Sequence, residues 1–202
     1  MPIASEPITV SCLDQAAVVT LNSADGSNIL SLRVIGHLLE AVANLQTEAE
    51  AEAISSLIIT GNERFFSAGA DLNEIAKLTG PEAYKFSRLG QRLMNSIDSF
   101  PVPVIAAIRG YCMGGGMDLA LACDYRIAAP NAVFGHRGAS LGLITGWGGT
   151  QRLPRLIGRS RALQMFLLAE KVGANEALKI GLANHISADP IAEAQRILVV
   201  AD

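Results

Sequence analysis

The segment from Val104 to Ala129 constrains the fold more than any other part of the sequence. Val104–Ile108 (VIAAI) is a continuous apolar run without alternation, which is typical of a strand buried on both faces. A helical pattern follows at Gly116–Ala122, and its only charged residue is Asp118. A second strand pattern follows at Tyr125–Ala129. Two apolar strands joined by an almost wholly apolar helix predict an α/β fold with much parallel sheet.

The rest of the chain repeats this alternation of strands and helices. Ile8–Leu13 and Ala17–Leu21 are rich in β-branched residues and predict a hairpin about Asp14 and Gln15. Ser31 is a suitable N-cap for a helical pattern that follows it, and Ser56–Thr60 (SLIIT) is another strand. Further helical patterns lie at Leu72–Leu78, Pro81–Ile97, Gln151–Ile157, Arg161–Ala169 and Asn175–Ile180. We expect one domain over residues 1–202, with a helical C-terminal portion from about residue 150.

Composition excludes several classes of protein. The net charge is −3, so no basic surface for nucleic acid is expected. No apolar stretch approaches the roughly 20 residues that a bilayer requires, and the first ten residues carry no secretory signal pattern. The three cysteines form no C-x-x-C pair, which favours reduced thiols in a cytoplasmic protein. No metal site is expected, because the three histidines show no ligand spacing.

Two glycine-bearing turns, each at the start of a helix, carry the chemical signal. Gly114–Gly116 precede the apolar helix, and Gly69 lies in the segment Phe66–Leu72. A helix N-terminus offers unpaired N–H groups and partial positive charge, and glycine lets a ligand oxygen approach the backbone. Two amides from two such turns can stabilise a carbonyl that becomes an enolate.

The motifs GNERFFSAGADLNEI, PVPVIAAIRGYCMGGGMDLALACDYRIA, GWGGTQRLPRLIG and ANEALKIGLAN, in this order, resemble the crotonase (enoyl-CoA hydratase/isomerase) superfamily. The resemblance implies the ClpP/crotonase spiral fold of repeated ββα units. It also implies action on acyl-CoA thioesters through an enolate, without a metal or redox cofactor, in a homotrimer or hexamer. Relatives continue with further helices beyond the point that corresponds to Asp202, so we expect a shortened C-terminal helical part and an uncertain oligomeric state.

The resemblance also assigns site residues. The oxyanion-hole amides fall on Ala70 and Gly115. The substrate-binding segments fall on the same turns, at Ala68, Ala70, Asp71, Leu72, Asn73, Gly114 and Gly115.

Three positions carry acid/base side chains in well-studied branches of the superfamily. The first is Asp118, while the other two are Gly138 and Gly146, which have no side chain. Asp118 is therefore the only retained carboxylate, and hydration by two glutamates is doubtful. The resemblance still favours a hydratase or isomerase. The alternatives are another enolate reaction, such as decarboxylation, thioester hydrolysis or double-bond isomerisation, and a non-catalytic acyl-CoA-binding protein.

Three further residues have competing interpretations. Ser140 lies in a literal G-x-S-x-G (Gly138–Gly142), but the segment after it is a poor helix start, so we expect a structural serine and not a hydrolase nucleophile. We expect His136 to be a hydrogen-bonded histidine at a strand end. The alternative is that its imidazole reaches the space left by the missing glutamate, since positions 136 and 138 face the same way in extended chain. Trp147 is either core packing or a wall of the acyl pocket.

Overall fold

The computed structural model describes residues 6–199, and its largest sheet has six strands in the order β1-β2-β4-β7-β9-β12. β1 (Ile8–Leu13) and β2 (Ala16–Leu21) form the expected antiparallel hairpin. The remaining neighbours pair in parallel: β4 (Ser56–Thr60), β7 (Val104–Ile108), β9 (Tyr125–Ala128) and β12 (His185–Ile186). The α/β prediction from the apolar runs is confirmed.

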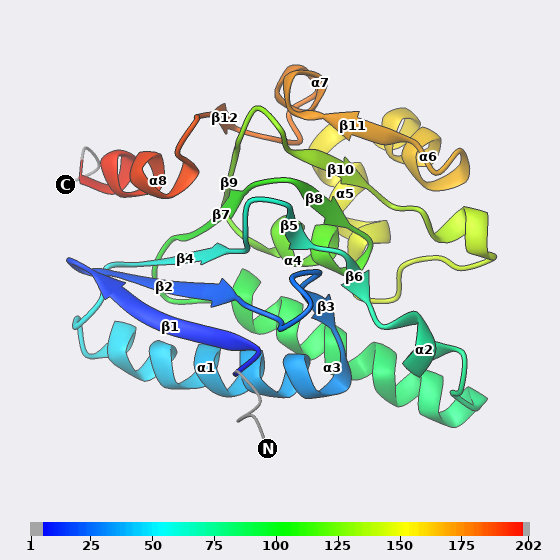
Figure 1. Ribbon diagram of the computed structural model, residues 1–202, viewed down its shortest axis with the longest axis horizontal. Coiled ribbons are helices and arrows are strands. Elements are labelled where there is room, and N and C mark those ends of the chain that lie inside the picture. Colours follow the sequence, from blue (N-terminus) through cyan, green and yellow to red (C-terminus); the bar gives the residue numbers. More distant parts are fainter. Residues whose placement is uncertain (1–5, 200–202) are drawn as a thin grey trace.

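Both faces of the large sheet are covered, which explains why its central strands are apolar without alternation. Val104, Ala106 and Ile108 face the main core, where α1 (Leu32–Glu50), α3 (Gly80–Asp98) and α4 (Gly115–Ala122) pack. Ile105 and Ala107 face a second cluster that α8 (Pro190–Val199) covers. Figure 1 shows α1 and α3 on one side of this sheet and α8 on the other.

A second sheet, in the order β11-β10-β8-β5, stands beside the first (Figure 1). Its members are β5 (Phe65–Ser67), β8 (Tyr111–Met113), β10 (Val133–Gly135) and β11 (Lys171–Gly173). Three times the chain runs from a strand of the large sheet to a strand of the small sheet and on to a helix: β4, β5 and α3; β7, β8 and α4; β9, β10 and α5 (Gly149–Ile157). This succession is the expected repeat of ββα units.

Most predicted helices are present with small changes in their ends. Ser31 caps α1 as expected, and its side chain accepts a hydrogen bond from the Val34 amide. The prediction of a helix over Leu72–Leu78 is only partly right, because α2 ends at Ile75. The remaining helices are α6 (Arg159–Leu167) and α7 (Ala174–Lys179). Two short strands, β3 (Ile29–Leu30) and β6 (Gly69–Ala70), pair with each other in parallel. Among residues 6–199, no helix combines the length and hydropathy needed to cross a bilayer.

Candidate active site

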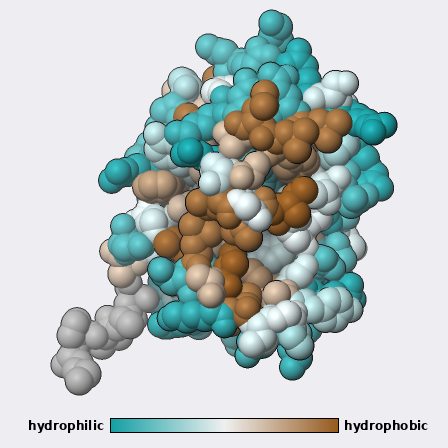
Figure 2. Space-filling model, turned by 90° about the vertical axis from the view of Figure 1, so that its right-hand side faces the viewer, coloured by the Kyte–Doolittle hydropathy of each residue, from teal (hydrophilic) through white to brown (hydrophobic). Residues whose placement is uncertain are grey.

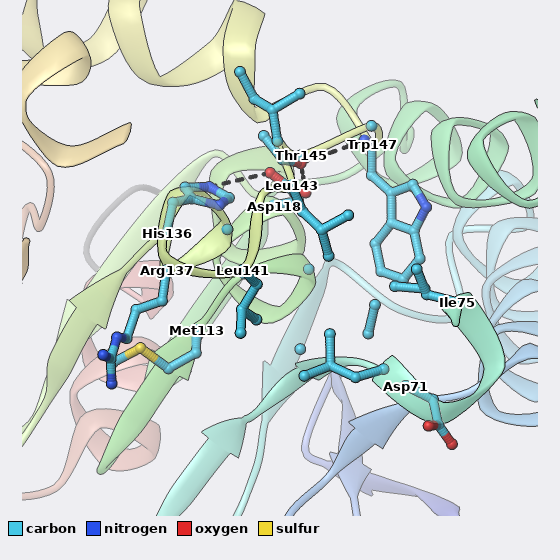
Figure 3. Close-up of a pocket in the computed structure, with 18 of the residues that line it drawn as sticks. Asp71, Ile75, Met113, Asp118, His136, Arg137, Leu141, Leu143, Thr145 and Trp147 are labelled. Carbon is cyan, nitrogen blue, oxygen red and sulfur yellow. Dashed lines mark hydrogen bonds and ion pairs between the residues drawn. The ribbon is translucent and has the colours of Figure 1, made fainter. Parts of the chain in front are cut away.

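One cavity of about 800 Å³ opens between α2, α3, the start of α4 and the segment after β10. Every residue that the sequence singled out for the site lines it: Ala68, Ala70, Asp71, Leu72, Asn73, Gly114, Gly115, Asp118, His136, Gly138 and Trp147. Figure 3 shows Asp118 and His136 at one end of the cavity and Asp71 at the other. The fold therefore gathers segments that are far apart in the sequence around a single space.

The two glycine-bearing turns are in direct contact. A Cβ on Gly69, whose φ is +99°, would lie 2.7 Å from the Met113 carbonyl oxygen and 3.1 Å from the Gly115 nitrogen. Only glycine fits this approach, so the turn before Ala70 and the turn before Gly115 are adjacent because residue 69 has no side chain. Gly115 is the first residue of α4, where amides lack an intrahelical acceptor. The geometry brings the two turns that bear the predicted oxyanion-hole amides to one side of the cavity.

Asp118 lies in the first turn of α4 with only 1% of its surface exposed. The Thr145 hydroxyl donates a hydrogen bond to its Oδ2, and His136 Nε2 lies 3.3 Å from its Oδ1. The Trp147 amide in turn donates to Thr145 Oγ1 at 3.4 Å (Figure 3). A buried carboxylate thus has one polar neighbour on each of its oxygens.

The structure differs from the expectation that His136 is a hydrogen-bonded structural residue. His136 does follow the end of β10, but its Nε2 has no well-formed hydrogen bond, and the ion-pair contact with Asp118 is its polar neighbour. The alternative interpretation assumed that residues 136 and 138 face the same way in an extended chain, and this assumption is wrong. The chain is not extended from 136 to 138, because a 3₁₀ turn, η1 (Gly138–Leu141), begins at Gly138. His136 reaches Asp118 because the small sheet ends beside α4.

Gly138 is required by its own loop. A Cβ there would lie 2.6 Å from the Leu143 carbonyl oxygen, and the Leu143 amide donates to the Gly138 carbonyl at 2.9 Å. The loop therefore leaves no room for a side chain at position 138. Gly146 plays a different part, since its carbonyl accepts hydrogen bonds from Ser87 and Gln91 of α3.

Ser140 has the local structure expected of a structural serine. It lies inside η1, and its hydroxyl donates to the Arg137 carbonyl at 2.7 Å. No α-helix begins directly after it, and within residues 6–199 no imidazole or carboxylate is hydrogen-bonded to it. These features differ from a serine-hydrolase elbow.

Trp147 packs in the core and also lines the cavity. Its indole is 3% exposed and packs on Phe86 with ring centroids 5.3 Å apart. The ring lies between Gly90 and Gly115, because a Cβ on either glycine would overlap it. The same ring also lines the cavity.

Neither Thr145 nor the apolar mouth of the cavity was predicted from the sequence. Leu72, Leu141 and Ile144 are 51%, 56% and 68% exposed around the opening. Figure 2 shows apolar side chains gathered on this side of the molecule. An apolar run in the loop after η1 could have indicated this mouth, whereas Thr145 has no local signal. Within residues 6–199, no group of three or more His, Cys, Asp or Glu side chains is arranged to hold a metal.

Comparison with known proteins agrees with the resemblance. The family model described as enoyl-CoA hydratase/isomerase matches residues 14–201. A crotonyl-CoA hydratase of Syntrophomonas wolfei is 40% identical over 185 residues, which cover 91% of this chain and 70% of that protein. A probable enoyl-CoA hydratase of Bacillus subtilis is 43% identical over 169 residues, covering 83% of this chain and 64% of that protein.

Solved structures confirm the fold. DspI of Pseudomonas aeruginosa superimposes with a TM-score of 0.88 at 35% identity, covering 98% of this chain and 80% of that one. Enoyl-CoA hydratase of Bacillus anthracis superimposes with a TM-score of 0.87 at 35% identity, covering 96% of this chain and 75% of that one. The chain spans 60 to 70% of the length of the curated relatives compared. On its sequence, its repeated ββα units and its paired glycine turns, this chain belongs to the enoyl-CoA hydratase/isomerase family, with the crotonase fold.

Proposed function

We propose that this protein acts on acyl-CoA thioesters in a reaction of the enoyl-CoA hydratase/isomerase type. The observation that carries this proposal is the contact between the Gly69 and Gly115 turns beside the buried Asp118. The amides of Ala70 and Gly115 hold the thioester oxygen, and the N-terminus of α4 adds partial positive charge. These groups stabilise the enolate that forms when the acyl chain gains or loses a proton. Asp118 and its neighbours form the acid/base centre.

The shape of the cavity supports a CoA thioester over a free acid. Asp71 lies at the end of the cavity away from Asp118 (Figure 3). It contacts the CoA portion together with Ala68, Leu72, Asn73 and Gly114, which line the same cavity. Apolar side chains of α2, α3 and the loop after η1 surround the acyl chain. The reaction needs only a polarised carbonyl and proton transfer, so no step calls for a metal or redox cofactor.

A second candidate is migration of a carbon–carbon double bond by one acid/base group. It is favoured by the two glycines, Gly138 and Gly146, at positions to which the resemblance assigns acid/base carboxylates. One group can shuttle a proton between two carbons more readily than it can replace both partners of a two-glutamate hydration.

We further infer that the chain works as a single cytoplasmic domain that assembles into homotrimers or hexamers. Its three cysteines are free thiols, which fits a reducing compartment. Leu167 and Leu168 at the end of α6 are 70% and 71% exposed, which suits an interface between subunits. Sedimentation velocity tests the assembly, and a monomer at micromolar concentration would contradict it.

The oxyanion hole is tested with matched ligands. Butyryl-CoA and S-butyl-CoA share the CoA part and the chain length, but only the thioester has the carbonyl oxygen. Two hydrogen bonds to that oxygen, each worth about 0.5–1.5 kcal/mol, should make the thioester bind about 5- to 150-fold tighter by calorimetry. Equal affinities for butyryl-CoA and S-butyl-CoA would contradict an oxyanion hole at these amides. A panel of 2-enoyl and 3-enoyl thioesters followed by mass spectrometry then separates hydration, which adds 18 Da, from isomerisation, which adds nothing.

A further inference from the structure

Three side chains from three separate segments meet behind the oxyanion turns. Thr145, Asp118 and His136 form a continuous line of contacts, from the Thr145 hydroxyl to Asp118 Oδ2 and from Asp118 Oδ1 to His136 Nε2 at 3.3 Å. A Cβ on Gly149 would collide with Asp118 Oδ1 and would lie 2.9 Å from Thr145 Cγ2 and 3.0 Å from His136 Nε2. All three side chains therefore converge on one point, which only glycine at position 149 leaves free.

The two ends of this line differ in their access to substrate. Asp118 has a neighbour on each carboxylate oxygen, and its Oδ1 is fully enclosed. Asp118 lines the cavity too, but a substrate that bonded to either of its oxygens would compete with Thr145 or His136. His136 lines the cavity and turns Nε2 toward Asp118. Its Nδ1 is not among the enclosed atoms and has no hydrogen-bond partner in residues 6–199.

The imidazole is also held on its flank. The ring of Phe166, from α6, lies 5.0 Å from the His136 ring centroid at an angle of 45°. Among the described side chains, Asp118 is the one charged group in contact with the imidazole, and Arg137 lies on the same cavity wall. α6 (RSRALQMFL) contributes Phe166 and contains no Asp or Glu, so no second acid faces the ring from that helix.

We propose that His136 is the acid/base residue that meets the substrate, and that Asp118 and Thr145 are positioning residues that hold it. The inference rests on the proposed function, because it assigns the proton transfer of that same site. A neighbouring carboxylate fixes the tautomer and orientation of an imidazole and stabilises the imidazolium that forms. Thr145, donating to the other oxygen, keeps the carboxylate from turning away.

For addition of water to a 2-enoyl thioester, the step balances as follows. Neutral His136 takes a proton from water while the water oxygen bonds to Cβ, and the electron pair of the double bond moves to the thioester oxygen. The resulting enolate is held by the Ala70 and Gly115 amides. The imidazolium then returns the proton to Cα. One water has been added, and His136 is neutral again.

Kinetics with crotonyl-CoA compare His136→Gln with a matched control. His185 also lies 3.3 Å from a carboxylate, that of Glu193, but it is 44% exposed and does not line the cavity. His136→Gln should lower kcat by about 10²–10⁴-fold with little change in KM, while His185→Gln leaves both unchanged. Added imidazole should restore part of the activity of His136→Ala. A His136→Gln enzyme with full kcat would overturn the proposal.

The positioning residues are tested by conservative exchange. Thr145→Ser keeps the hydroxyl and should retain most of kcat, whereas Thr145→Val, of nearly the same size, should lose it. Asp118→Asn should lower kcat in both the presence and absence of imidazole. If Asp118→Asn abolishes activity while His136→Ala keeps it, Asp118 itself meets the substrate and the assignment is wrong.

A binding measurement decides the matter independently of turnover. Butyryl-CoA, which has no double bond to hydrate, is titrated into protein with ¹³C-labelled histidine rings. We expect the ring signal of His136 to shift and those of His37 and His185 to stay in place. Binding without a shift at His136 would overturn the inference but leave the proposed function intact. Absence of butyryl-CoA binding would overturn the proposed function itself.

Discussion

A methyl group on Gly115 should destabilise the protein because it meets the Trp147 indole. The added Cβ would lie closer than 3.0 Å to ring carbons Cζ3 and Cε3, and ordinary contact begins at about 3.4 Å. The ring cannot retreat, since Gly90 touches its opposite side and Phe86 packs against it. Overpacking of this kind costs about 1–3 kcal/mol.

The cost is measured as a shift in the thermal midpoint. For a chain of this length, about 1–3 kcal/mol corresponds to a fall of about 2–12 °C in calorimetry or circular dichroism. Gly36→Ala is the matched control, because a Cβ on Gly36 meets nothing within 4 Å in the middle of α1. That substitution should raise the midpoint, since alanine in a helix is favoured over glycine by about 0.5–1 kcal/mol.

A double-variant cycle separates the indole contact from other effects. In a Trp147→Leu background the ring is gone, so Gly115→Ala should cost little, and the coupling between the two sites should be about 1–3 kcal/mol. Gly115→Ala as stable as Gly36→Ala, or an unchanged penalty in the Trp147→Leu background, would refute the reasoning.

Three further predictions follow from the same structure. Gly138→Glu should lower the thermal midpoint and give no gain in hydration of crotonyl-CoA, because its Cβ would lie 2.6 Å from the Leu143 carbonyl oxygen. Faster hydration by this variant would contradict the prediction. At pH 8 a thiol reagent should label only the exposed Cys12 in the native protein, because burial raises the pKa of Cys112 and raises that of Cys123 to about 12. The Cys12→Ser variant should therefore take up no label until it is unfolded, and labelling of the folded variant would contradict this. The pKa of Asp189 is lowered, first by a hydrogen bond from the Ala192 amide of α8 and also by Arg109. The Asp189 carboxylate therefore stabilises the folded protein above its ordinary pKa of 3.8, and this stabilisation is lost as the pH falls through its lower pKa in the folded state. Asp189→Asn should therefore remove part of the loss of stability below pH 4, and an unchanged acid unfolding curve would contradict the assignment.

The first five strands of the large sheet, most of the helices, the two glycine turns and the position of Asp118 at a helix start could be predicted from the sequence. These features are local. A run such as Val104–Ile108 shows that both of its faces are buried, and a glycine at a helix start shows where amides are accessible, whatever lies around them. The resemblance carried by the same segments indicated the family, and the fold agrees with it.

The small sheet could not be predicted in the same way. β8 and β10 have three residues each, which is too short for a period to be recognised. Their pairing decides where His136 lies, because β10 ends beside α4. The sequence therefore left His136 with two interpretations.

The surroundings of Asp118 were decided by tertiary structure alone. Thr145 is 27 positions away in the chain, and its hydroxyl reaches Asp118 only because the loop after η1 folds back over α4. Gly138 is explained by the same loop, whose carbonyl occupies the space of a side chain. Periodicity and motifs report the burial and backbone needs of each segment, but the contacts between segments depend on how the sheets and helices stack. The proposed acid/base centre consists of such contacts, so its carboxylate could be picked out in the sequence, whereas its partners could be found only in the folded chain.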